Sequence, residues 1–280
     1  MTQQVTTTVQ DPAADRELKA RHRGMWALGD YPAVASEIIP SMGPVLVAAA
    51  AIGPGTRVLD VAAGSGNVAV PAALAGAEVV ASDLTPDLLA AGRRAAEAAG
   101  AQLAWQEADV EALPYADGRF DAVVSCVGIM FAPHHQRAAD EVLRVTRPGG
   151  RIAFASWTPQ GFIGQMFATM KPYAAPPPPG AQPPPLWGSE DHVRALLGDR
   201  VTDLTFERRD VVVDRFDTGA EFRDYFKDNY GPTIAAYRGL AGSRDRAAAL
   251  DGELAALGDR GLDADGTMRW EYLLVTARKR

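Results

Sequence analysis

"VLDVAAGSGNVAV", residues 58–70, has the pattern of a buried strand that enters a glycine turn and continues into a helix. From Gly64 onward the letters G-S-G-N-V-A fit the loose G-x-G-x-x-A pattern of a nicotinamide-binding loop. From Asp60 onward the letters D-V-A-A-G-S-G place an acid four residues ahead of the first glycine. The first pattern predicts a pyrophosphate ligand, and the second predicts a ligand that carries a positive charge.

The alternation of strands and helices continues from this stretch to about residue 157. Strands are expected at 57–62, 78–83, 102–109, 120–127 and 151–157, separated by helices at 67–77, 86–100 and 135–146. Two later alternating runs, 201–216 and 268–279, are expected to pair antiparallel at the sheet edge. We therefore predict an α/β, Rossmann-like fold, with a mostly parallel seven-stranded sheet, helices on both faces and helical cap elements.

The remaining segments suggest how the chain is organised around this core. We predict a disordered tail over residues 1–15, a helical cap over 16–54 and a cofactor-binding core over 55–157. Residues 158–280 are expected to add a substrate lid with insertions and the C-terminal edge strands to the same domain. This last part includes a proline-rich segment, 172–185, to which we assign no role.

Composition and charge narrow the kinds of partner. The 280 residues carry a formal charge of −7, so we expect a small-molecule partner rather than a nucleic acid. The single cysteine, Cys126, excludes both an intramolecular disulfide and a thiolate metal cluster. No secretory signal is visible, and the longest apolar run, 45–52, is too short to span a membrane, so we expect a cytoplasmic protein without membrane contact. The oligomeric state is left open.

Two acids discriminate between the candidate ligands. Asp83 ends the second expected strand, 23 residues after Asp60, at the position of a carboxylate that binds ribose hydroxyls. A carboxylate at Asp60 would repel a pyrophosphate but would attract an ammonium or a sulfonium. The free N–H groups of the loop suit the carboxylate of an amino acid. Adenosine, an amino acid and a positive sulfur together describe S-adenosylmethionine.

Four stretches in sequence order strengthen this interpretation: "VLDVAAGSGN", "ASDLTPDLL", "EADVEALPYADGRFDAVVS" and "EVLRVTRPGGRIAFASW". They resemble the successive motifs of class I S-adenosylmethionine-dependent methyltransferases, particularly the small-molecule group that includes the ubiquinone/menaquinone C-methyltransferases. The resemblance covers about residues 55 to 157. One position departs from it, because Ala62 replaces the first loop glycine of the family. We expect the methyl group to be compatible with a non-positive φ at that position.

The resemblance implies which residues surround the amino-acid end of the cofactor. Asp60 would meet the ammonium, directly or through water. Gly64 and the loop near Ala62 would approach the methionine part. The backbone of Ser125 and Cys126, at the end of the fourth strand, would line the same end.

The resemblance also implies contacts to the nucleoside and the sulfonium. Asp83 would accept the ribose hydroxyls, and Leu84 would pack on the adenine. Asp109 would accept a hydrogen bond from the adenine amino group, with the Val110 backbone beside it. Tyr31 would cover the sulfonium with its ring, an arrangement worth about 0.5–2 kcal/mol; packing of this ring onto the core is an equally good interpretation.

His134 and His135 are the candidate catalytic residues. They follow the fourth strand, where a histidine can serve as general base for a hydroxyl acceptor. The simpler interpretation, capping or solvation at the start of a surface helix, is favoured over catalysis. No metal is expected, because the sulfonium itself supplies the electrophile.

The function predicted from these observations is transfer of a methyl group from S-adenosylmethionine to a C, O or N atom of a small organic acceptor. Two alternatives remain: an NAD(P)-dependent oxidoreductase, and a catalytically inactive S-adenosylmethionine-binding protein. Several apolar side chains are candidates for the wall of an acceptor pocket, although such residues are more often core: Trp157, Phe162, Met166, Phe167, Trp187, Phe226 and Tyr230.

Overall fold

The structure is a computed structural model that describes residues 12–280. Residues 1–11 of the expected tail lie outside the described residues. The first helix, α1 (Pro12–Trp26), begins four residues before the end of the expected tail, so residues 12–15 are helical.

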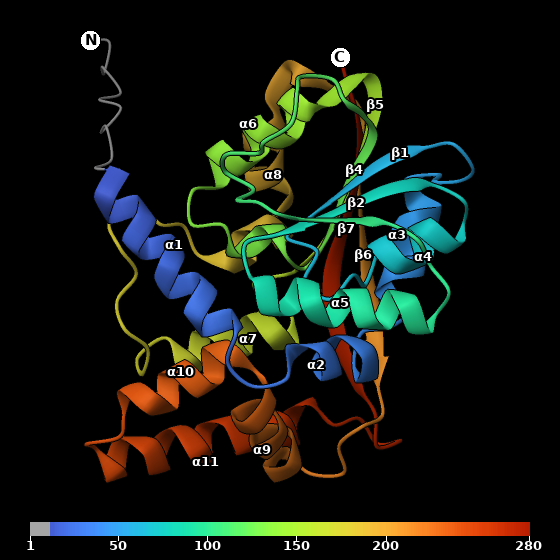
Figure 1. Cartoon of the computed structure of the whole chain (residues 1–280). Coiled ribbons are helices and arrows are strands. Elements are labelled where there is room, and N and C mark those ends of the chain that lie inside the picture. The colour runs from blue at the N-terminus through green and yellow to red at the C-terminus, as the bar shows by residue number, and fades with distance from the viewer. Residues whose placement is uncertain (1–11) are drawn as a thin grey trace.

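One seven-stranded sheet forms the centre of the molecule, as the sequence predicted (Figure 1). Its order is β3-β2-β1-β4-β5-β7-β6. The first five strands are parallel, and β7 inserts antiparallel between β5 and β6. The strands are β1 (Arg57–Val61), β2 (Glu78–Asp83), β3 (Ala104–Glu107), β4 (Phe120–Cys126), β5 (Thr146–Trp157), β6 (Val201–Val213) and β7 (Met268–Lys279).

Helices cover both faces of this sheet. α3 (Met42–Ala49) and α4 (Ala69–Leu74) pack together on one face, whereas α6 (His135–Val145) and α8 (Glu190–Leu197) pack on the other (Figure 1). α5 (Pro86–Ala98) contacts β2 and β3. α3 contacts β4 and β5, so it belongs with the sheet although we expected residues 16–54 to form the cap.

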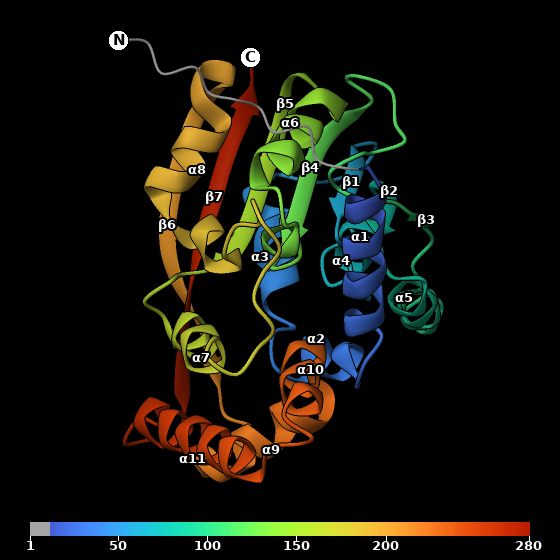
Figure 2. The same ribbon diagram turned by 90° about the vertical axis from the view of Figure 1, so that its left-hand side faces the viewer.

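A second group of helices gathers beyond the carboxyl ends of the parallel strands (Figure 2). It combines helices from both ends of the chain, because α1 contacts α10 (Gly231–Gly239) and α2 (Tyr31–Glu37) contacts α9 (Gly219–Asn229). α7 (Phe162–Met170) and α11 (Arg244–Gly261) complete it. Three short 3₁₀ helices occur at Ile129–Phe131, Pro184–Gly188 and Gly198–Arg200. Ligands of parallel α/β sheets bind at this end of the strands.

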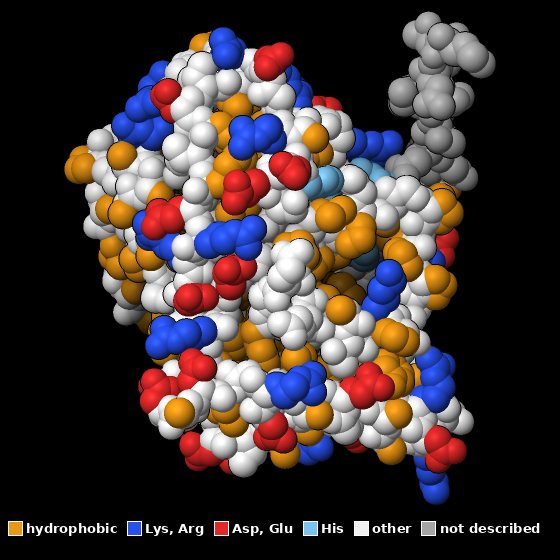
Figure 3. All heavy atoms as spheres, turned by 180° about the vertical axis from the view of Figure 1, so that it is seen from behind, with side chains coloured by type: hydrophobic (Ala, Val, Ile, Leu, Met, Phe, Trp, Pro, Cys, Tyr) orange, Lys and Arg blue, Asp and Glu red, His pale blue; other side chains and the backbone are white. Residues whose placement is uncertain are grey.

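The surface carries charges of both signs, and the large aromatic side chains lie in the interior. On the face opposite to that in Figure 1, acidic and basic side chains are interspersed, and hydrophobic side chains are visible in a hollow (Figure 3). Trp187, Trp270 and Phe154 are almost completely buried. Among the described residues, no single helix is long and apolar enough to cross a membrane; the α2–α3 pair passes on length and composition, with a bend of 72°.

Candidate functional site

The loop after β1 adopts three left-handed backbone conformations in five residues. Ala62 has φ +49°, Gly64 has φ +55° and Gly66 has φ +88°. Our expectation of a non-positive φ at Ala62 is therefore wrong. The turn requires a left-handed residue where the family has glycine, and alanine adopts that conformation at a cost of about 1–2 kcal/mol. Gly128 approaches the loop so closely that a Cβ on it would lie 2.0 Å from the Ala62 carbonyl oxygen.

Asp60 lies beneath this loop with one oxygen satisfied and one not. Its side chain is 1% exposed, and Oδ2 accepts a hydrogen bond from the Ala69 N–H, 3.0 Å away, at the start of α4. Oδ1 is buried and makes no hydrogen bond with any described residue. Burial raises the pKa of Asp60 to about 8. A donor with positive charge beside Oδ1 would restore the ionised carboxylate.

Asp83 joins the end of β2 to the glycine loop. Its Oδ2 accepts from the Gly64 N–H and its Oδ1 accepts from the Thr85 N–H, each at 2.8 Å. Burial raises the pKa of this carboxyl, and these two N–H donors act in the opposite direction. Asp83 therefore has a structural task, fastening the loop to β2, that the sequence analysis did not predict.

A pocket with an empty volume of about 660 Å³, part of it open to solvent, lies above these two strands. Seven of the ten residues predicted to bind a cofactor line it: Tyr31, Ala62, Gly64, Asp83, Leu84, Asp109 and Val110. Leu88, Ala108, Gly128 and Phe131 extend the same wall. The pocket thus brings together residues from α2, from the ends of β1 and β2, and from the loop after β3.

Asp60, Ser125 and Cys126 do not line this pocket. The Ser125 hydroxyl donates to the Val61 carbonyl at 2.8 Å and accepts from the Ile129 N–H at 2.9 Å. The Cys126 thiol lies 3.6 Å from the Asn67 amide, and burial raises its pKa to about 12. Both side chains brace the strand ends behind the pocket, and contact of their backbone with a cofactor stays a prediction.

Helix α1 supplies three lining residues, Lys19, His22 and Trp26, of which the sequence analysis missed Lys19 and His22. Their spacing of three and four residues places them on one face of the helix, a signal that was visible in "DRELKARHRGMW". The Lys19 ammonium lies 3.1 Å from Asp109 Oδ1 and 2.8 Å from Glu111 Oε2. Burial and the nearby Lys19 charge lower the pKa of His22 to about 4, so this ring is neutral.

Three potential metal-ligand atoms also lie near Lys19. Side-chain atoms of Asp15, Glu111 and His134 lie within 4.8 Å of one another. The Lys19 ammonium is in contact with Glu111, so a positively charged side chain already pairs with this cluster.

Tyr31 covers the glycine loop from the cap side. A Cβ placed on Gly64 would lie 3.4 Å from Cε1 of Tyr31, so the ring is in van der Waals reach of the loop. Trp26 supports the Tyr31 ring edge-on, with centroids 5.3 Å apart and planes at 79°. Burial raises the pKa of Tyr31, so its hydroxyl stays protonated. Contact with a sulfonium stays a prediction.

The two candidate general bases lie away from the pocket. His135 is fully buried between α6 and α8, where its Nδ1 lies 2.9 Å from Nε2 of His192 and its ring packs on Trp187. Burial lowers its pKa to about 3. The His134 N–H donates to Glu111 Oε1 at 2.7 Å. Neither histidine lines the pocket, so the general-base role does not fit their position, and His135 is not at a surface.

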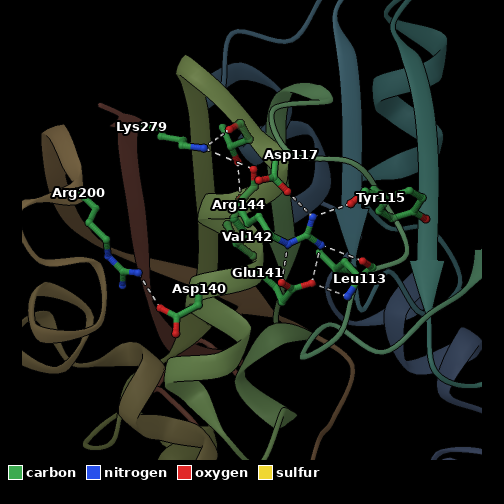
Figure 4. A network of polar contacts seen from close by, with 10 residues as sticks. Leu113, Tyr115, Asp117, Asp140, Glu141, Val142, Arg144, Arg200 and Lys279 are labelled. Carbon is green, nitrogen blue, oxygen red and sulfur yellow. Dashed lines mark hydrogen bonds and ion pairs between the residues drawn. The ribbon is translucent and has the colours of Figure 1, made fainter.

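A network centred on Arg144 of α6 holds the loop that carries Asp109 and Val110 (Figure 4). The Arg144 guanidinium donates to the carbonyl oxygens of Leu113 and Tyr115 at 2.8 and 2.6 Å. It also pairs with Glu141 at 2.7 Å, and Glu141 Oε2 accepts from the Leu113 N–H. The loop is therefore fastened to a helix on the opposite side from the pocket.

Comparison with known proteins bears on this site. The family model described as a methyltransferase domain matches residues 59–154, which include β1 to β5 and the glycine loop. A demethylmenaquinone methyltransferase of Thermus thermophilus is 42% identical over 115 residues, 40% of this chain and 52% of that protein. Residues 59–154 of the chain therefore form a methyltransferase domain.

The relatives of the chain include an uncharacterised protein of Mycobacterium tuberculosis, which is 53% identical over 97% of this chain and 99% of the relative. Among solved structures, a putative methyltransferase from Bacillus halodurans has a TM-score of 0.57 at 21% identity and covers 84% of this chain and 97% of that chain. Geranyl diphosphate methyltransferase in complex with SAM has a TM-score of 0.53 at 18% identity and covers 86% of this chain and 85% of that chain. At these identities the solved structures establish the fold alone.

Proposed function

We propose that the protein transfers a methyl group from S-adenosylmethionine to a small organic acceptor. The observation that carries the proposal is the buried, unsatisfied Oδ1 of Asp60 beneath a glycine loop that faces a pocket. A buried carboxylate oxygen without a donor is unfavourable, and an ammonium group bound at the loop relieves it through a bridging water, since Asp60 itself does not line the pocket. The residues present therefore fit S-adenosylmethionine better than a pyrophosphate-bearing cofactor.

When bound, S-adenosylmethionine supplies a methyl carbon made electrophilic by a positively charged sulfur. The protein's part is to bind, orient and exclude water. Asp83 keeps lone pairs for ribose hydroxyls beyond those that accept from Gly64 and Thr85. Leu84 and Leu88 offer an apolar wall for the adenine, and Asp109 a carboxylate for its amino group.

The charge of the protein supports a small molecule as the methyl acceptor. The formal charge of −7 disfavours a polyanionic acceptor, and the face in Figure 3 mixes both signs. A cytoplasmic location remains a prediction from the sequence.

The decisive test is calorimetric titration with S-adenosylhomocysteine and with S-adenosylmethionine. Asp60→Asn keeps the shape of the side chain and removes its charge, so we expect S-adenosylmethionine to bind roughly tenfold to a hundredfold more weakly. Asp87→Asn is the matched control, because Asp87 is an exposed acid at the start of α5 and should leave affinity unchanged. Tight NADPH binding by the wild type without S-adenosylhomocysteine binding would instead support the oxidoreductase alternative.

The same titration should show that ligand binding releases a proton from the protein. At pH 7 the free protein holds Asp60 mostly protonated, because its pKa is about 8. An ammonium beside Oδ1 lowers that pKa, so binding should release close to one proton. Titrations in phosphate and in Tris buffers, which differ in ionisation enthalpy, measure this release. It should disappear in Asp60→Asn, and a release that persists there would rule out Asp60 as its source.

A further inference from the structure

A second cavity adjoins the cofactor pocket on the far side of Tyr31, which lines both. It has an empty volume of about 330 Å³. Its walls come from the cap and from the strand ends beneath it: Tyr31, Val34, Ile39, Val127, Trp157, Ile163, Met166, Phe226, Tyr230 and Trp270. Of these, only Val127 falls within the stretch matched by the family model. The shape of this cavity is therefore set mainly by the chain's own cap.

The charge of a ligand in this cavity is constrained by its walls. None of the ten described residues that line it is acidic, basic or histidine. An ion transferred from water into such a site would lose its hydration without gaining a counter-charge, which is strongly unfavourable. The walls therefore select an uncharged molecule.

The shape of the ligand is constrained by aromatic side chains. Trp157 meets Trp270 edge-on at a centroid distance of 6.1 Å, and Phe226 meets Trp270 in the same manner at 5.8 Å. Phe226 also packs edge-on against Tyr230 at 5.4 Å. Such walls present ring faces and edges, which pair best with another flat ring.

The polar groups of the cavity are hydrogen-bond donors. The hydroxyls of Tyr31 and Tyr230 make no hydrogen bond with any described residue, and Tyr230 is only 5% exposed. Burial raises the pKa of each phenol, so both hydroxyls keep their protons. The Trp270 indole N–H is also buried without a partner among the described residues. A ligand that brings an oxygen acceptor would satisfy a donor that the protein leaves unpaired.

We infer that this cavity is the acceptor subsite and that it takes an uncharged, largely apolar ring compound whose oxygen accepts a hydrogen bond from the Tyr230 hydroxyl. The assignment as acceptor subsite rests on the proposed function, because it follows from the position of the cavity beside the cofactor pocket, with Tyr31 lining both. Binding of such a compound rests on the cavity alone. Tyr230 is accordingly a specificity-determining residue.

The test uses three probes with the same ring system: 2-naphthol, naphthalene and 2-naphthoate. Binding to the full chain is measured by ligand-observed NMR, both with and without S-adenosylhomocysteine. We expect 2-naphthol to bind at least roughly tenfold more tightly than 2-naphthoate, because the cavity lacks a counter-charge. Equal or tighter binding of 2-naphthoate would overturn the inference.

The Tyr230→Phe variant isolates the hydroxyl. We expect it to weaken 2-naphthol about fivefold to tenfold, the effect of losing one neutral hydrogen bond, and to leave naphthalene unchanged. A merely structural role for Tyr230 would weaken both probes equally, which would contradict the assignment. Tyr173→Phe is the matched control, since the Tyr173 hydroxyl donates to Glu253 outside the cavity.

Binding of S-adenosylhomocysteine by each variant serves as the folding check and separates the two proposals. If it binds and 2-naphthol does not, the acceptor inference fails and the proposed function stands. If 2-naphthol binds as expected and S-adenosylhomocysteine does not, the cavity is a ligand site and the methyltransferase proposal fails.

Discussion

Ala62 holds a backbone conformation that is unusual for a residue with a side chain. The turn after β1 needs a left-handed residue at this position, and Ala62 adopts φ +49° there. The surrounding contacts hold it in place, because Gly128 packs against the Ala62 carbonyl and Asp83 binds the Gly64 N–H. The strain is local and is offset by the closure of the loop.

Replacement of this residue tests the strain directly. The Ala62→Gly substitution removes about 1–2 kcal/mol of left-handed strain from the folded state. The greater conformational entropy of the unfolded chain offsets about 0.4–1 kcal/mol of this gain. We expect the free energy of unfolding in urea to rise by about 0–1 kcal/mol. Ala63→Gly, at a neighbour without positive φ, should lower it by about 0.5–1 kcal/mol. Equal losses in the two variants would contradict the strain at Ala62.

At the scale of elements, the loop between β3 and β4 is held in part by a helix that follows it in the chain. Arg144 and Glu141 of α6 bind its backbone at Leu113 and Tyr115 (Figure 4). The guanidinium suits this task because it presents several donors in one plane. A helix that makes no contact with the pocket thereby sets the place of Asp109 and Val110.

The Arg144→Lys substitution keeps the positive charge but loses the planar guanidinium with its several hydrogen-bond donors. We expect the free energy of unfolding to fall by about 1–3 kcal/mol, since a single ammonium cannot replace bonds to two carbonyls and a carboxylate. Amide exchange in residues 108–118 should quicken, and S-adenosylhomocysteine should bind more weakly. Arg137→Lys on the same helix, whose side chain is 46% exposed, should change neither stability nor exchange. Unchanged exchange in Arg144→Lys would show that the loop is held by other contacts.

At the scale of the whole molecule, the two ends of the chain meet to close the site. α1 brings Lys19, His22 and Trp26 over the cofactor pocket, and α9 and α10 bring Phe226 and Tyr230 to the neighbouring cavity. The contacts between α1 and α10 and between α2 and α9 join these two groups. Closure over a ligand therefore involves both ends together.

Hydrogen exchange measures this coupling. Saturation with S-adenosylhomocysteine should slow amide exchange in α1 and α2 by roughly tenfold or more, because opening these helices would release the ligand. α8, which packs on α6 at the other face of the sheet, should keep its rate. Protection confined to the glycine loop would show that α1 and α2 do not close over the ligand.

Local patterns account for the parts of the structure that the sequence predicted. The succession of β1 to β5 along the chain, the antiparallel pairing of β6 with β7, and the place of seven of the ten proposed cofactor residues in one pocket agree with strand periodicity, glycine turns and motif spacing. The predicted boundaries of strands and helices were less accurate than their succession. The strand expected at 102–109 spans only Ala104–Glu107, and the helix expected at 67–77 only Ala69–Leu74. Hydrogen bonds to neighbouring elements, which periodicity does not report, decide such ends.

The amino-acid sequence by itself determined the fold class, the position of the glycine loop and the acids around it, because these depend on spacings within one short stretch of chain. Only the tertiary structure decided that His135 is buried against His192, that Ala62 is left-handed, and that Lys19 lies over Asp109. Those features depend on which distant side chains pack together. Burial, which sets the pKa values of Asp60 and His135, exists only once the sheet and its cap have closed.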